Sequence, residues 1–186
     1  QADLTLCTSP QLADDLRSCG VRRIDVWQKG INADRFSPSF RSDEMRHRLS
    51  DGHIDAPLLI YVGRIGAEKK LHRLKKVLDL NPGARLAFVG KGPMDAEMRE
   101  FFKGYPVHFA GQLVDDELSS AFASADIFVM PSDSETLGFV VLEAMASGIP
   151  VVGVAAGGLV DLIENDKTGY LVENKDDMIE FSQRVK

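Results

Sequence analysis

The sequence predicts an α/β fold in which a parallel sheet carries helices on both faces. From Pro57 onward, short apolar runs alternate with helical patterns. The runs are continuously apolar, which is typical of parallel strands that are buried on both faces. Several of them end at a glycine or a proline. The connections between successive strands are therefore expected to be right-handed crossovers.

The individual elements follow from the same alternation. Strands are expected at residues 58–62, 85–89, 107–110, 126–130, 150–154 and 169–172, and helices at 70–80, 94–103, 115–123, 139–147 and 159–165. The glycines and the proline at the strand ends would lie together at the carboxyl edge of the sheet. Because open α/β sheets bind ligands at that edge, the loops there are the first candidates for chemistry.

The first fifty or so residues have a different pattern. Expected strands at 3–8 and 24–27 flank a helix that Ser9 caps and Pro10 begins. Residues 30–38 have the composition of a linker, and residues 41–49 form a charged helical pattern. Trp27 could be a platform for a ligand, but it is more simply a buried packing residue. Since the chain opens inside an apolar segment and ends inside a helical pattern, we expect it to be a piece of a larger protein.

Composition narrows the possible functions. Lys and Arg number 22 against 28 Asp and Glu, which gives a net charge of −6. This balance argues against a sequence-independent nucleic-acid binder, because neutralising phosphates needs clustered positive charge. The four histidines have no metal-ligand spacing, and two cysteines cannot form a four-ligand zinc site. We expect no metal site and no nucleic-acid partner.

The segment at residues 134–150 is the most informative one. A helix is expected to begin near residues 136–138, and its start would expose unpaired N–H groups that suit a phosphate. Gly138 would let a ligand approach the backbone closely. Glu143 lies further along this helix among apolar neighbours. Either it accepts hydrogen bonds, for example from ribose hydroxyls, or it lies on a solvated stripe of the helix.

Three other loops follow expected strands. Arg64 and Lys69 follow the strand at 58–62 and could reach one anion together, or they could be two solvated cations. Residues 89–93 lack both the GxGxxG and the P-loop spacing and are more simply a tight strand-to-helix turn. The backbone of residues 111–113 could face a nucleobase.

In their order along the chain, these segments resemble the family 4 glycosyltransferases, which are retaining enzymes of the GT-B fold. Gly63-Arg64-Ile65 with Glu68-Lys69 is similar to the G-R-[LI]…E-K motif of that family, and residues 89–93 are similar to its V-G-x-G-P turn. Residues 131–152 resemble its E-x7-E segment, in which Glu135 and Glu143 are the two glutamates. Gly157-Gly158 and residues 169–172 resemble its closing motifs.

The resemblance implies roles for these residues. Arg64 and Lys69 would hold the diphosphate of a UDP-sugar and the charge that develops on the leaving group, and Glu135 would contact the sugar. These three are the expected catalytic residues. No bound metal or other cofactor would be needed, because cations and a helix start replace it. The expected nucleotide site consists of Gly63, Arg64, Lys69, Gly111, Gln112 and Leu113 near the uracil, Glu135, the backbone at Leu137, Gly138 and Phe139, and Glu143 at the ribose.

The resemblance also implies a domain organisation. Residues 1–40 would be the end of an N-terminal acceptor domain plus the interdomain linker. Residues 41–186 would be a Rossmann-like nucleotide-binding domain, the C-terminal half of a GT-B enzyme, incomplete at its own C-terminus. The chain alone would then be inactive, since the acceptor site lies in the N-terminal domain.

Three stretches, residues 27–32, 36–46 and 130–145, resemble plant and algal members that transfer sulfoquinovose from UDP-sulfoquinovose to diacylglycerol. This implies a lipid acceptor bound by the N-terminal domain, peripheral membrane contact and a place at the chloroplast inner envelope. Alternatives are another donor, such as UDP-glucose or GDP-mannose, a sugar-nucleotide epimerase or phosphorylase of the same fold, and a non-catalytic nucleotide-binding module.

Overall fold

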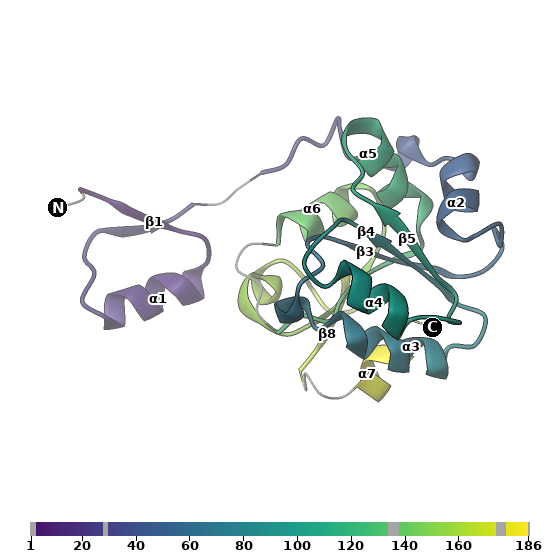
Figure 1. Ribbon diagram of the computed structural model, residues 1–186. Coiled ribbons are helices and arrows are strands. Elements are labelled where there is room, and N and C mark those ends of the chain that lie inside the picture. The colour runs from purple at the N-terminus through teal and green to yellow at the C-terminus, as the bar shows by residue number, and fades with distance from the viewer. Residues whose placement is uncertain (1–2, 28–29, 134–137, 174–177, 186) are drawn as a thin grey trace.

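The computed structural model describes residues 3–27, 30–133, 138–173 and 178–185. Its main feature is a six-stranded sheet in which every neighbouring pair of strands is parallel (Figure 1). The strands are β3 (Leu58–Val62), β4 (Arg85–Val89), β5 (Val107–Gly111), β6 (Ile127–Met130), β7 (Val151–Val154) and β8 (Gly169–Val172). All six expected strands are confirmed. Their order in the sheet is β5-β4-β3-β6-β7-β8, so the direction of winding reverses between β3 and β6.

Helices cover both faces of this sheet, as predicted (Figure 1). On one face, α2 (Asp43–Leu49) packs against α5 (Asp115–Ser124), and α5 also contacts α6 (Phe139–Ala146). On the other face, α3 (Leu74–Leu80) packs against α7 (Met178–Gln183), beside α4 (Asp95–Phe101). Among the described residues, no helix combines the length and the hydropathy that crossing a bilayer requires.

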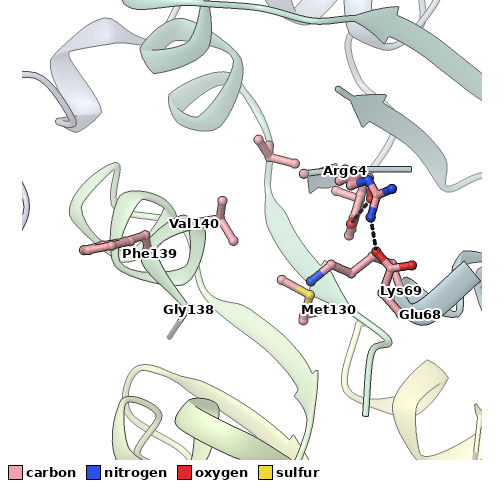
Figure 2. A pocket seen from close by; sticks show the side chains of 10 residues that line it. Arg64, Glu68, Lys69, Met130, Gly138, Phe139 and Val140 are labelled. Carbon is pink, nitrogen blue, oxygen red and sulfur yellow. Dashed lines mark hydrogen bonds and ion pairs between the residues drawn. The ribbon is translucent and has the colours of Figure 1, made fainter. Parts of the chain in front are cut away.

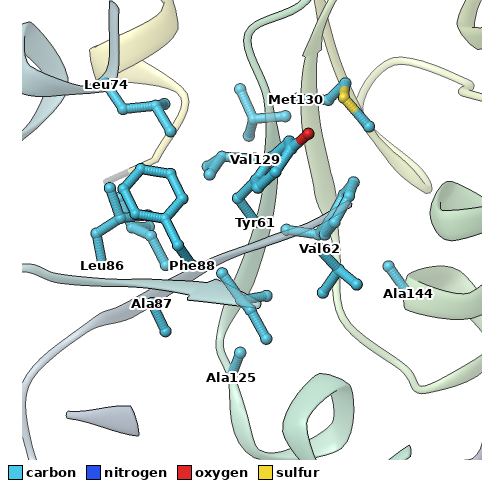
Figure 3. Close-up of a cluster of buried hydrophobic side chains, with 14 of the residues drawn as sticks. Tyr61, Val62, Leu74, Leu86, Ala87, Phe88, Ala125, Val129, Met130 and Ala144 are labelled. Atoms are coloured by element: carbon cyan, nitrogen blue, oxygen red, sulfur yellow. The ribbon is translucent and has the colours of Figure 1, made fainter. Parts of the chain in front are cut away.

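A single hydrophobic core lies between the sheet and the helices (Figure 3). All five residues of β3 are buried, which is the pattern that a central parallel strand requires. Tyr61 and Phe88, from the neighbouring strands β3 and β4, pack edge to face with their ring centroids 5.9 Å apart. Leu74 of α3 is fully buried beside this pair, so the helix is fixed on the sheet by its apolar side.

A buried arginine fixes the amino edge of the sheet, opposite the expected ligand edge. The Arg46 guanidinium donates to both carboxylate oxygens of Asp126, at 3.0 and 2.8 Å. It also donates to the carbonyl oxygens of Ile54 at 2.6 Å and Ser124 at 2.9 Å. Asp126 in turn accepts from the backbone N–H of Leu58 at 2.8 Å. The sequence does not predict this pair, because the charged helical pattern at residues 41–49 does not show which of its cations is buried.

The N-terminal residues form a separate, small unit. In it, β1 (Thr5–Cys7) and β2 (Ile24–Val26) pair in parallel around α1 (Pro10–Ser18), and the Ser9 side chain caps α1 by accepting from the N–H of Leu12. The prediction that Trp27 is buried is wrong, because 53% of this residue is exposed. The residue follows β2 in a unit of only three elements, which is too small to enclose a large ring.

Two expected helices differ from the structure. The helix expected at 70–80 begins only at Leu74, because Lys70 has a left-handed backbone with φ 53° and a short 3-10 helix (Leu71–Arg73) follows it. The helix expected at 159–165 is a 3-10 helix at Gly157–Asp161. It stops early because Asn165 accepts from the N–H of Leu171 at 2.7 Å, so the following residues are engaged with β8.

Candidate functional site

The carboxyl ends of the central strands meet where the winding of the sheet reverses, between β3 and β6. In open α/β folds this switch point is the usual place for a ligand. A cavity of about 430 Å³ lies there (Figure 2). Its wall includes five of the predicted site residues, Gly63, Arg64, Lys69, Gly138 and Phe139, together with Tyr61, Val62, Glu68, Met130 and Val140, which the sequence analysis did not select.

A buried tyrosine of β3, Tyr61, contacts the loop that follows the strand. Gly63 has φ 152°, which favours glycine, and a Cβ at this position would lie 2.9 Å from the hydroxyl oxygen of Tyr61. The same hydroxyl donates to the carbonyl oxygen of Arg64 at 2.9 Å. The backbone that carries Arg64 is therefore fixed although its side chain is 65% exposed.

The loop after β4 braces the loop after β3 through backbone contacts. The N–H of Gly63 donates to Val89 at 2.9 Å, and the N–H of Ile65 donates to Lys91 at 3.1 Å. A Cβ at Gly90 or Gly92 would overlap the backbone of Gly63 or Ile65 respectively. Residues 89–93 therefore form a tight turn packed against the neighbouring loop, as the sequence analysis favoured over a phosphate loop.

Arg64 and Lys69 lie on the same side of the cavity and face α6 across it (Figure 2). Arg64 is paired with Glu68 at 3.3 Å, in an ion pair that is exposed to solvent. Such an exposed pair contributes little to stability, so the arginine is available to a stronger anionic partner. Glu68 was seen as part of a motif, but its pairing with Arg64 was not predicted.

A second arginine joins the loops after β3 and β6. Arg73 donates to the carbonyl oxygen of Pro131 at 3.1 Å and pairs with Asp133 at 3.5 Å. The Ser132 hydroxyl donates to the carbonyl oxygen of Glu68 at 3.3 Å. These contacts fix the start of the loop that leads toward α6. Arg73 was missed because it falls inside an expected helix and belongs to no motif.

The far wall of the cavity is the beginning of α6. Gly138 caps this helix in a left-handed conformation with φ 64°, and its Cβ position is only 3.1 Å from Leu162, so a larger residue would be strained there. Phe139 is 39% exposed beside it. The predicted residues Glu135 and Leu137 lie outside the described residues.

Glu143 lies further along α6 and is not part of the cavity wall. It is half-buried. Burial raises the pKa of its carboxyl, and the positive charge of Arg35 offsets part of this rise. A half-buried carboxylate is costly unless it accepts hydrogen bonds, so its environment is consistent with a site for hydroxyl groups.

The end of β5 lies at the same edge of the sheet. Gly111 has φ 74°, and its carbonyl oxygen accepts from the N–H of Gly90 at 2.7 Å. Gln112 is exposed, whereas Leu113 is 6% exposed and belongs to the core. Leu113 can therefore offer a ligand only its backbone. Among the described residues, no cluster of three or more His, Cys, Asp or Glu could hold a metal ion.

The family described as "Glycosyl transferases group 1" matches residues 47–186 of this sequence. The chain belongs to this family. The match contains the sheet and the cavity, so the family resemblance seen in the motifs is confirmed.

Individual relatives add detail. The chain is 52% identical to the sulfoquinovosyl transferase SQD2 of Arabidopsis thaliana over 176 residues. The aligned region covers 91% of this chain and 34% of that protein. It is 38% identical to a GDP-mannose-dependent alpha-mannosyltransferase of Mycobacterium tuberculosis, over 92% of this chain and 44% of that protein. The chain thus spans about a third to a half of the length of these relatives.

Solved structures agree with the fold. A sucrose-phosphate synthase from Thermosynechococcus elongatus superimposes with a TM-score of 0.84 and 28% identity, over 100% of this chain and 48% of that one. Alr3699/HepE of Anabaena, crystallised with UDP-glucose, gives a TM-score of 0.85 at 22% identity, over 99% of this chain and 53% of that one. The predicted Rossmann-like half of a GT-B enzyme is therefore confirmed.

Proposed function

We propose that this chain is the nucleotide-binding part of a retaining glycosyltransferase and that it binds the UDP moiety of a sugar donor. One observation carries the proposal: Arg64 and Lys69 border a cavity at the switch point of the sheet, opposite the start of α6. Two cations on one wall and a helix start on the other would hold a diphosphate between them. Glu135 would contact the sugar, as the family motif implies.

The same arrangement would assist the departure of the nucleotide. When the bond to the sugar breaks, negative charge develops on the diphosphate. Arg64, Lys69 and the backbone N–H groups at the start of α6 would stabilise that charge from fixed positions, which is often the largest contribution to catalysis. Donor binding would then need no metal ion.

The nucleoside would extend from this cavity along the same edge. Glu143 would accept hydrogen bonds from the ribose, and the backbone of residues 111–113 would face the uracil. The half-burial of Glu143 and the exposure of Gln112 support this placement.

The relative with 52% identity supports sulfoquinovose as the transferred sugar, and the family resemblance implies the lipid acceptor. We propose that the whole protein transfers sulfoquinovose from UDP-sulfoquinovose to diacylglycerol. It would bind the lipid through an N-terminal domain and would be a peripheral protein of the chloroplast inner envelope membrane. The mycobacterial relative supports a second candidate, a mannosyltransferase that uses GDP-mannose.

Calorimetric titration of the chain with UDP tests the diphosphate site. Arg64→Ala and Lys69→Ala are each expected to weaken UDP binding roughly 10–100-fold, because each removes a charged hydrogen bond of about 1.5–3 kcal/mol. Arg17→Ala and Lys103→Ala are matched controls, since both cations are exposed and pair with a nearby acidic residue elsewhere on the surface. Unchanged affinity in both site variants would sink the assignment. Addition of EDTA is expected to leave UDP affinity unchanged.

Competition between nucleotides separates the two donors. UDP is expected to bind more tightly than GDP, and UDP-sulfoquinovose is expected to displace bound UDP at lower concentration than UDP-glucose does. Tighter binding of GDP would favour the mannosyltransferase instead.

A further inference from the structure

The segment that joins the N-terminal unit to the large sheet is docked on α5 and α6. The ring of Phe36 is buried and lies edge to face with Phe122 of α5, with the centroids 5.9 Å apart. Pro38 lies so close to Gly148, just after α6, that a Cβ there would come within 2.7 Å of its ring. These two contacts fix the segment on the helices that border the proposed site.

Arg35 precedes Phe36, and its backbone is held as well. Its N–H donates to the carbonyl oxygen of Asn32 at 3.1 Å and to the Asn32 side chain at 3.2 Å. The position from which the Arg35 side chain extends is therefore set by a turn on one side and a buried ring on the other.

The side chain of Arg35 reaches the loop that ends β5. Its guanidinium donates to a carboxylate oxygen of Asp115 at 2.7 Å. Asp115 is the first residue of α5 and has φ 50°, so it forms the bend between residues 111–114 and the helix. This contact joins the segment that carries Arg35 to the end of the loop proposed to face the base.

Arg35 also acts on α6. Burial raises the pKa of the Glu143 carboxyl, and among the described residues the positive charge of Arg35 opposes this rise. Arg35 therefore contacts the segment proposed to face the base, and its charge also acts on the carboxylate proposed to bind the ribose.

We propose that Arg35 is a positioning residue for the nucleoside half of the donor site. It ties the loop at 111–115, through Asp115, to the segment at residues 32–38 that is docked on α5, without contacting the diphosphate. This inference rests on the proposed function. It makes the segment at residues 32–38 part of the donor site, so nucleoside binding and the position of that segment influence each other.

The test compares the affinities of the chain for UDP and for inorganic pyrophosphate. Arg35→Ala is expected to weaken UDP binding about 5–10-fold and to leave pyrophosphate binding unchanged. Arg35→Lys, which keeps the charge, is expected to restore most of the UDP affinity. Asp115→Asn, which removes the same ion pair from the other side, is expected to weaken UDP but not pyrophosphate.

Arg48→Ala is the matched control. Arg48 also reaches α5 from another element, pairs with Glu117 at 3.0 Å, and its side chain is 43% exposed against 44% for Arg35. This variant is expected to bind UDP like the unaltered chain. Equal UDP affinity in the Arg35→Ala and Arg48→Ala variants, equal losses for UDP and pyrophosphate, or no recovery with lysine would each overturn the inference.

The outcomes also separate this inference from the proposed function. If the unaltered chain binds UDP and Arg64→Ala weakens that binding while Arg35→Ala does not, only the role of Arg35 is wrong. If the unaltered chain binds no UDP, both are wrong.

Discussion

The backbone brace between the loops after β3 and β4 gives a prediction whose size follows from the geometry. A Cβ at Gly92 would overlap the carbonyl oxygen of Ile65 and lie 2.7 Å from both its carbonyl carbon and its nitrogen. These neighbours are backbone atoms and cannot rotate away, so the Gly63–Ile65 loop would have to shift. Overpacking of this kind costs about 1–3 kcal/mol. Gly90 has φ 135° as well as an overlap with Gly63, so a side chain there adds backbone strain of about 1–3 kcal/mol.

A substitution at Gly83 distinguishes the cost of backbone strain from the cost of overpacking. Gly83 has φ 98°, but no atom lies within 4 Å of its Cβ position. Gly83→Ala should therefore show backbone strain alone, partly offset by about 0.4–1 kcal/mol from the stiffer unfolded chain. We expect a loss of about 1 kcal/mol for Gly83→Ala, about 1–3 kcal/mol for Gly92→Ala and about 2–6 kcal/mol for Gly90→Ala.

Urea unfolding followed by circular dichroism measures these differences, and UDP titration of the folded variants measures their effect on the site. Gly92→Ala is expected to weaken UDP binding because the displaced loop carries Arg64, whereas Gly83→Ala leaves it unchanged. The reasoning is refuted if Gly92→Ala is as stable as the unaltered chain and binds UDP as tightly.

Three further predictions concern charged residues. Burial raises the pKa of Glu143, so the contribution of this group to stability is present below its unfolded-state pKa and is lost as the pH rises through the folded value. Glu143→Gln is therefore expected to stabilise the chain by about 0.5 kcal/mol in a thermal melt at pH 7 and to bind UDP more weakly. A loss of stability in this variant would contradict the prediction. Burial acts to raise the pKa of Asp51, but hydrogen bonds and charge from His108 and Arg85 outweigh it and leave this pKa lowered. Its stabilisation is present above the unfolded-state pKa and lost as the pH falls through the folded value. Asp51→Asn should therefore cost up to about 1 kcal/mol in urea unfolding at pH 7, and this cost should disappear as the pH is lowered through the folded value. Arg46→Lys is expected to cost about 1.5–3 kcal/mol, since lysine cannot reproduce the paired hydrogen bonds to Asp126; a calorimetric scan that matches the unaltered chain would show that the buried pair adds no stability.

The sheet was predictable because its strands are continuous apolar runs with glycine or proline at their ends. The predictions that failed concern the local backbone at two helices and the burial of one side chain. Lys70 adopts a left-handed conformation that nothing in its residue type indicates, and Asn165 pairs with β8 where a helical pattern continued. Trp27 was expected to be buried from its residue type, but burial depends on how much surrounding structure is present.

The candidate site was predictable to the extent that motifs carry it. Arg64, Lys69 and Gly138 come together at one cavity because parallel strands place their following loops at one edge. Two arginines that tie neighbouring segments of this edge together, Arg73 and Arg35, were not predicted. Their partners lie 58 to 80 positions away in the sequence, so no local pattern contains both members of a pair.

The central claim is that the carboxyl edge of the sheet between β3 and α6 binds a nucleoside diphosphate. Hydrogen–deuterium exchange of the chain, measured by mass spectrometry with and without saturating UDP, tests it most directly. The account predicts that UDP slows exchange in peptides covering residues 63–69, 111–115 and 138–143, and leaves residues 46–58 at the amino edge unchanged. Protection confined to the amino edge, or no protection at saturating UDP, would contradict it.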